Sequence, residues 1–147
     1  MVVINILLSI KSEYTERIFS GGKKYEFRKQ KPKRPINRVF VYECAPLKNI
    51  VGWFSVRRII SGSPREIWEK CKDSSGIVQE DYFAYCKGKK VIHAFEIHET
   101  YQFHHPVDPH EIAFDFNPPQ NFTYLDSSKI AKTLGNKEGV HRCLDLG

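Results

Sequence analysis

The sequence predicts an α+β fold, a small mixed β-barrel with helices packed around it. Five stretches have the composition of β-strands, and the expected order is strand, helix, three strands, two helices and a final strand. This order lacks the regular alternation of strands and helices that builds a doubly wound sheet. With 147 residues, of which 41% are hydrophobic, the chain is long enough for one domain with its own core.

The chain opens with a strand and a helix. The apolar run from Val3 to Ile10 predicts the strand. In SIKSEYTERIFSGG, Tyr14 and Ile18 fall on one helical face. Gly21 or Gly22 can adopt the left-handed conformation that ends a helix, so we expect the helix to stop there.

Three strands are expected next. Lys23 to Lys29 alternates apolar and polar residues, and the charged, proline-containing KQKPKRPIN that follows predicts a loop. Arg38 to Cys44 is apolar on both faces, which is typical of a central strand. Ile50 to Ile60 is the next strand, and Gly52 within it indicates a bulge or a bend.

The clearest local signature is the helix start in SPREIWEKC. Ser63 is the N-cap, Pro64 occupies the first helical position, and Glu66 completes a capping box. A second helix is predicted from about Gln79 to Cys86, and Val91 to Phe103 predicts a long strand.

The C-terminal part has a different character. PVDPHEIAFDFNPPQNFTYL has four prolines and no sustained period, so we expect a wrapping loop. SSKIAKTLG predicts a short helix with Asp126 or Ser127 as its cap, and the residues after about Asn136 are expected to be mobile. We therefore divide the chain into a domain over 1–125 and an extension over 126–147 that is partly helical or mobile.

Several classes of protein are not favoured. No apolar run approaches the ~20 residues of a membrane span, and MVVINILLSI lacks the features of a signal peptide, which predicts a cytoplasmic protein. The cysteines are widely spaced without a CxxC pair, and no histidines have HExxH spacing. We expect buried free thiols, no metal and no cofactor. The residues concerned are Cys44, Cys71, Cys86, Cys143, His93, His98, His104 and His105.

Positive charge is concentrated near the second strand. The net charge is +6, and eight cations lie between residues 23 and 38 against the single acid Glu26. Such a strip favours a polyanion such as nucleic acid, although a solvated loop is the alternative. The residues expected to contact nucleic acid are Lys24, Lys29, Lys31, Lys33, Arg34 and Arg38.

The pattern Gly21-x-Lys23-x-x-Glu26-x-Arg28 resembles the motif of the ASCH family, a branch of the PUA-like β-barrels. The likeness runs from the first strand to the strand ending near Phe103, which makes 1–125 an ASCH-like domain. It implies a curved barrel with a cleft beside the first helix, where the motif residues collect, and a protein that binds RNA or acts on RNA or its modified nucleosides. One bacterial branch consists of amidohydrolases that act on N4-acylated cytidine.

That branch differs from this chain at two positions. It has Thr where Glu26 stands, and its third motif residue is a Glu that aligns with Asp81.

By strand parity Lys23 and Glu26 should point to opposite faces. They converge only if Gly21 and Gly22 turn the chain so that Lys23 projects from the turn.

Three roles remain open for this cluster. It could be a structural ion pair, or a binding site in which Lys23 and Arg28 hold a phosphate or base carbonyl while Glu26 accepts from an exocyclic amine. It could also be catalytic, through Lys23, Glu26 and Asp81. Glu26 opposes a lysine base because it raises the lysine pKa, but a Glu26-activated water would work. For Asp81, a solvated acidic helix face is the alternative.

We expect first an RNA- or nucleotide-binding protein, acting in RNA metabolism or in regulation of transcription or translation. Its ligand-binding residues would be Gly21, Lys23, Glu26, Arg28 and, as a stacking side chain on the proline-rich loop, Tyr124. The alternative is a hydrolase, either an amidohydrolase on N4-acylated cytidine or a ribonuclease. A protein-interaction domain is a third option, for which no sequence feature speaks.

Overall fold

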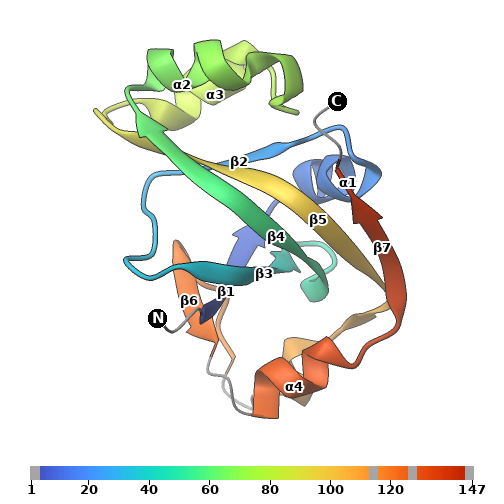
Figure 1. The fold of residues 1–147 in the computed structure, drawn as a ribbon. Helices are drawn as coiled ribbons and strands as arrows, with labels where there is room; N and C mark the ends of the chain where they lie inside the picture. The colour runs from blue at the N-terminus through green and yellow to red at the C-terminus, as the bar shows by residue number, and fades with distance from the viewer. Residues whose placement is uncertain (1–3, 113–115, 126–128, 145–147) are drawn as a thin grey trace.

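The computed structural model describes residues 4–112, 116–125 and 129–144 (Figure 1). The strands are β1 (Ile4–Ile10), β2 (Tyr25–Arg28), β3 (Ile36–Glu43), β4 (Asn49–Gly62), β5 (Ile92–Val107), β6 (Phe122–Leu125) and β7 (Gly139–Cys143). The helices are α1 (Ser12–Ser20), α2 (Pro64–Cys71), α3 (Gln79–Cys86) and α4 (Lys129–Gly135), with 3₁₀ turns at Lys72–Ser74 and Pro109–Glu111.

The described strands form one mixed sheet in the order β2-β5-β4-β3-β1-β6, with β7 also paired to β5. β1 and β3 run parallel, and the other pairs are antiparallel. The α+β class is therefore confirmed. Within the described part of the chain, β2 and β6 are the two end strands of this order and do not pair with each other, so closure into a barrel stays a prediction.

A bulge bends the long β4 strand where the sequence indicated one. The pairing of β4 shifts register between Ile50 and Gly52 on the β5 side. A Cβ atom at Gly52 would lie 2.2 Å from the Tyr101 carbonyl oxygen, so a side chain has no room there. Gly52 thus allows the backbones of β4 and β5 to approach closely where the sheet curves.

The two helices between β4 and β5 pack together at one end of the molecule, as Figure 1 shows. Ser63 caps α2 by accepting from the Glu66 amide, as predicted. The Tyr82 ring of α3 lies edge-on to Phe27 of β2, with ring centroids 5.0 Å apart. This contact holds α3 against β2 and so fixes one wall of the site described below.

Two expectations for the C-terminal part were wrong. Residues 122–125, expected in a loop, form β6 on the edge of β1. Residues 139–143, expected to be mobile, form β7 along β5, and Leu144 after them is buried. Both strands are too short to show a period in sequence and depend on a long-range partner. The proposed caps Asp126 and Ser127 lie outside the described residues, and the division at residue 125 stays a prediction.

The thiols only partly match expectation. Cys71 and Cys86 are buried, but Cys44 is half-buried and Cys143 is exposed. All four are free. Among the described helices, none has the length and apolar character needed to cross a membrane. The cytoplasmic location stays a prediction.

Candidate functional site

A cleft of about 570 Å³ lies between α1, β2 and α3. Lys23, Glu26 and Arg28 line it, so the three charged motif residues do converge on one cavity. Asp81 of α3 lines the same cleft while remaining exposed. Side chains that were not predicted to belong to the site complete the lining, among them Tyr14, Ile77, Tyr85 and Gln120.

The turn after α1 places Lys23 in the cleft. Gly21 adopts a left-handed conformation with φ of 90° and ends the helix. The Lys23 amide then donates to the Arg17 carbonyl at 3.0 Å, and β2 begins only at Tyr25. Lys23 therefore precedes the ladder, which is how its side chain reaches Glu26 despite strand parity. Gly21 itself contributes the turn and not a cleft contact.

The Lys23 side chain is buried, with only 1% of its surface exposed. Its Nζ donates to the Ser75 carbonyl at 2.8 Å and lies 3.9 Å from Glu26 Oε1. The nitrogen also sits 5.3 Å from the centroid of the Tyr14 ring and 4.9 Å from that of Phe27. Burial lowers the pKa of the Lys23 ammonium below its ordinary value of 10.5, and the charge of Glu26 partly opposes this effect.

The Ser75–Gly76 backbone covers Lys23 from the other side. Gly76 has a φ of +66°, and a Cβ atom there would lie 2.4 Å from Lys23 Cβ. Arg17 Nη1 donates to the Gly76 carbonyl at 2.8 Å. This cover was not predicted from the sequence. The DSSG turn before α3 is the signal that indicates it, because it contains the glycine that the close approach requires.

Glu26 and Arg28 form a second ion pair on the cleft floor. Arg28 Nη1 lies 3.2 Å from Glu26 Oε2. The same guanidinium donates through Nη2 to the Asn121 carbonyl at 3.0 Å and through Nη1 to the Ser9 carbonyl at 3.4 Å. Arg28 thus links edge strand β2 to β1 and to the residue preceding β6, the other edge of the sheet.

Tyr124 does not line the cleft. It pairs with Ile6 in the β1–β6 ladder, and 49% of its surface is exposed. The reason is that β6 forms a strand where a loop was expected. Tyr85 of α3 and Tyr14 of α1 are the tyrosines that do face the cleft.

The predicted basic strip divides into several environments. Lys29 lines a smaller cavity of about 280 Å³ that shares Arg28, Tyr85 and Gln120 with the main cleft. Lys31, Lys33 and Arg34 are exposed in the loop after β2, and Lys24 is half-exposed. Arg38 instead stacks on Trp53, 4.1 Å from the ring centroid, in the β3–β4 region of the sheet.

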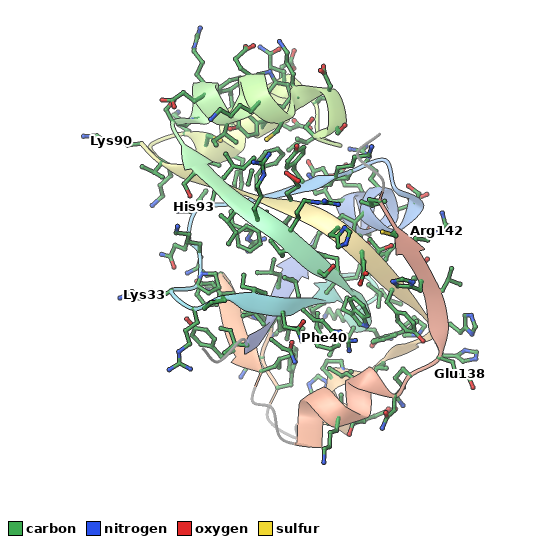
Figure 2. All side chains as sticks on the ribbon, in the orientation of Figure 1. Lys33, Phe40, Lys90, His93, Glu138 and Arg142 are labelled. Atoms are coloured by element: carbon green, nitrogen blue, oxygen red, sulfur yellow. The ribbon has the colours of Figure 1, made fainter. Side chains whose placement is uncertain are left out.

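A second group of lysines was missed. Lys87, Lys89 and Lys90 are exposed in the turn between α3 and β5. Because Arg28 pairs with His93 at the start of β5, this turn lies next to the loop that follows β2. Lys33 and Lys90 project from the same side of the molecule in Figure 2.

This chain matches a protein family, a curated relative and a solved structure over most of its length. Residues 3–114 match the family described as a domain of unknown function, DUF365. The chain is 26% identical to the ASCH domain-containing ribonuclease of Zymomonas mobilis, over 87% of this chain and 88% of that protein. The crystal structure of ASCH from Zymomonas mobilis superimposes with a TM-score of 0.81 at 24% identity, covering 91% of this chain and 96% of that one.

Two proteins of Ureaplasma parvum also match part of their length. The chain is 34% identical to its ATP synthase subunit alpha and 31% identical to its large ribosomal subunit protein uL22, over 82% of this chain in both cases. It spans only 15% of the first and 39% of the second. These two matches therefore concern a segment of each relative and not its whole length.

The buried ammonium predicts a pH dependence of stability. The unfolded chain keeps the Lys23 proton to a higher pH than the folded protein does, because the folded pKa is lowered. Between the two pKa values the unfolded state binds more protons, so this group makes stability rise with pH. We expect the free energy of unfolding of the wild type, relative to Lys23→Met, to increase as the pH rises from neutral toward the ordinary lysine pKa of 10.5.

Urea denaturation of both proteins across that range measures the difference. Lys24→Met, which removes a positive charge from a half-exposed neighbour, is the matched control. The quantity compared is the free energy of unfolding of the wild type minus that of Lys23→Met. If this difference stays constant or decreases as the pH rises, burial does not destabilise the charged form of Lys23.

Proposed function

We propose that this chain, a member of the DUF365 family, which is of the ASCH type, binds a nucleotide of single-stranded RNA in the cleft between α1, β2 and α3. Its family membership confirms the resemblance drawn from the motif. The observation that carries the proposal is the buried Lys23 beside the Glu26–Arg28 pair, on the floor of a cleft of nucleotide size.

The charged floor has the donors and acceptors that read a base edge. The Glu26 carboxylate oxygens can accept from an exocyclic amino group such as cytosine N4. Lys23 and Arg28 are donors toward a base carbonyl or a phosphate oxygen. With only 1% of Lys23 exposed, a ligand must enter the cleft to reach the ammonium. The charged residues at the bottom of the cleft are therefore better placed to contact a base that enters the cleft than an RNA backbone that crosses its mouth.

The cleft walls supply aromatic surface for that base. Tyr14 and Tyr85 come from the two helices that flank the cleft, α1 and α3. Stacking on such rings tolerates any base and adds affinity. Bases of single-stranded RNA are free to leave the stack, whereas a duplex hides them, and this favours single-stranded RNA as the ligand.

A path for the phosphates leads out of the cleft. The smaller cavity adjoins the main one, and Lys29 lies there with its Nζ 4.5 Å from the Tyr85 ring centroid. Beyond it are the exposed lysines of two neighbouring turns. These are Lys31, Lys33, Lys87, Lys89 and Lys90. A chain with its base in the cleft would run its backbone across these lysines.

Removing the stacking wall should weaken binding. For Tyr85→Leu we expect the dissociation constant for a short fluorescent oligoribonucleotide to rise by roughly 5- to 150-fold, since stacking on one aromatic ring contributes roughly 1–3 kcal/mol. Fluorescence anisotropy at fixed salt measures it. Tyr124→Leu is the matched control, because that ring lies outside the cleft. Equal affinities of both variants and the wild type would refute the cleft as the binding site.

The phosphate path predicts a change in salt dependence. Each phosphate contact in a single-stranded complex contributes about 0.7 to the slope of log affinity against log salt. If both lysines contact a phosphate, we expect the double variant Lys89→Gln/Lys90→Gln to make this negative slope shallower by about 1.4. The control is Lys132→Gln/Lys137→Gln, near α4 at the other end of the molecule (Figure 1). If the control variant makes the slope shallower by the same amount, the net charge of the protein accounts for RNA binding and the proposed path is wrong.

Ribonuclease activity is a second candidate, favoured by the lowered pKa of Lys23 next to Glu26. Glu26 would accept the proton of a ribose 2′-hydroxyl as the 2′-oxygen attacks the adjacent phosphorus. Arg28 would offset the charge on the phosphoryl oxygens, and Lys23 would donate a proton to the departing 5′-oxygen. The 2′-O–P bond forms, the P–O5′ bond breaks, and a 2′,3′-cyclic phosphate results. A proton passing from Glu26 to Lys23 restores the site.

This route fits the residues better than amidohydrolase chemistry does. Glu26 stands where the amidohydrolase branch has a threonine, so the hydroxyl of that threonine is missing here. The ASCH relative from Zymomonas mobilis is named a ribonuclease, which also supports the RNA route.

Glu26→Gln tests the ribonuclease route. The amide keeps the shape of the side chain but cannot take a proton, so we expect RNA cleavage to fall by ~10²–10⁴-fold while anisotropy still detects binding. A gel of end-labelled RNA, with product ends probed for cyclic phosphate, measures this. An RNA with 2′-deoxyribose at the cleaved position should resist the wild type. Cleavage of that substrate at the normal rate, or full activity of Glu26→Gln, would rule out this mechanism.

A further inference from the structure

A second cluster of reactive side chains lies where β7 pairs with β5. His98 and Glu99 come from β5, and Cys143 is the last residue of β7. One donor atom from each lies within 4.8 Å of the other two. None of the three lines the cleft. We propose that they bind a divalent transition-metal ion of the zinc type, which clamps β7 to β5.

The backbone fixes the positions of these ligands. Glu99 and Cys143 are direct partners in the β5–β7 ladder, so their side chains start from adjacent points. The next residue, Leu144, donates its amide to the His98 carbonyl at 2.8 Å and is buried in the core. Cys143 is thus held between a ladder pair and a core anchor.

The donor set selects the kind of ion. A thiolate and an imidazole favour zinc and similar metals, whereas magnesium and calcium prefer oxygen ligands. A thiolate and a carboxylate together neutralise a divalent cation. Three protein ligands leave the fourth tetrahedral position to water or to His141, whose Nε2 lies 3.6 Å from Glu99 Oε2.

Binding requires only side-chain adjustment. Bonds of ~2.0–2.3 Å place the ligand atoms of a tetrahedral zinc about 3.5 Å apart, so the donors must close in by roughly 1 Å. His98 and Glu99 are about one-third exposed and Cys143 is exposed, so their side chains have room to rotate.

Arg57 opposes metal binding. Its Nη2 lies 2.7 Å from His98 Nδ1. Because arginine only donates, Nδ1 must accept, which leaves the proton of a neutral ring on Nε2. Coordination through Nε2 moves that proton to Nδ1 and breaks the contact with Arg57. Arg57 retains Glu96 as a partner at 3.5 Å. A glutamine at position 57 could instead accept from Nδ1, so Arg57→Gln should tighten metal binding.

Titration of metal-free protein with Co²⁺ tests the site directly. A cobalt–thiolate bond gives a near-ultraviolet charge-transfer band that oxygen and nitrogen ligands alone do not give. We expect one equivalent of Co²⁺ to produce this band in the wild type, and one equivalent of Zn²⁺ to abolish it. Cys143→Ser should lose the band, and His98→Ala and Glu99→Gln should each weaken Co²⁺ binding at least ten-fold. Arg57→Gln should bind more tightly than the wild type.

Cys44→Ser is the matched control, because Cys44 is the other thiol that is not buried. It should keep the band and the affinity. Far-ultraviolet circular dichroism of the metal-free variants checks that each is folded. The proposal is overturned if the wild type shows no band, if Cys143→Ser keeps it, or if His98→Ala and Glu99→Gln bind as tightly as the wild type. RNA binding measured in chelator is independent of this outcome.

Discussion

The buried ammonium of Lys23 is the constraint on which the site depends. Transfer of a charged lysine into the interior costs free energy, and here the Ser75 carbonyl, the Glu26 carboxylate and two aromatic faces offset that cost. An apolar side chain of similar volume often stabilises a fold as well as a buried charge does. Stability alone therefore gives little reason for a lysine at this position, whereas ligand recognition or proton transfer does.

Arg28 makes the site and the fold depend on each other. Its guanidinium lies between Glu26, the Ser9 carbonyl and the Asn121 carbonyl, and so spans the side of the sheet where β2 and β6 share no described ladder. Side-chain hydrogen bonds take the place of backbone pairing at this point. The cleft lies beside this link, and Ser9 and Gln120 are among the residues that line it. A ligand anion that draws Arg28 away from Asn121 would therefore also loosen the link to β6.

The features of this structure that could be predicted from the sequence are those that depend on residues close together in the chain. The Ser63 cap, the span of α3 and the turn that brings Lys23 to Glu26 each follow from a few neighbouring residues. What could not be predicted depends on residues far apart in sequence. The Ser75–Gly76 cover lies over Lys23 only because α2 and α3 fold back on β2, and β7 becomes a strand only beside β5. The spacing of cysteines and histidines in the sequence likewise gave no sign of the cluster of His98, Glu99 and Cys143, because these side chains meet across the β5–β7 ladder.

The central claim is that RNA enters the cleft between α1, β2 and α3. An NMR titration of ¹⁵N-labelled protein with a short single-stranded oligoribonucleotide tests it most directly, because every backbone amide reports at once. Our account predicts that the largest saturable shifts fall on the amides of Lys23 to Arg28 and on α3, with smaller shifts in the turn that contains Lys89. Shifts confined to the β3–β4 region around Arg38, with the cleft amides unchanged, would contradict the account and place RNA on another face of the sheet.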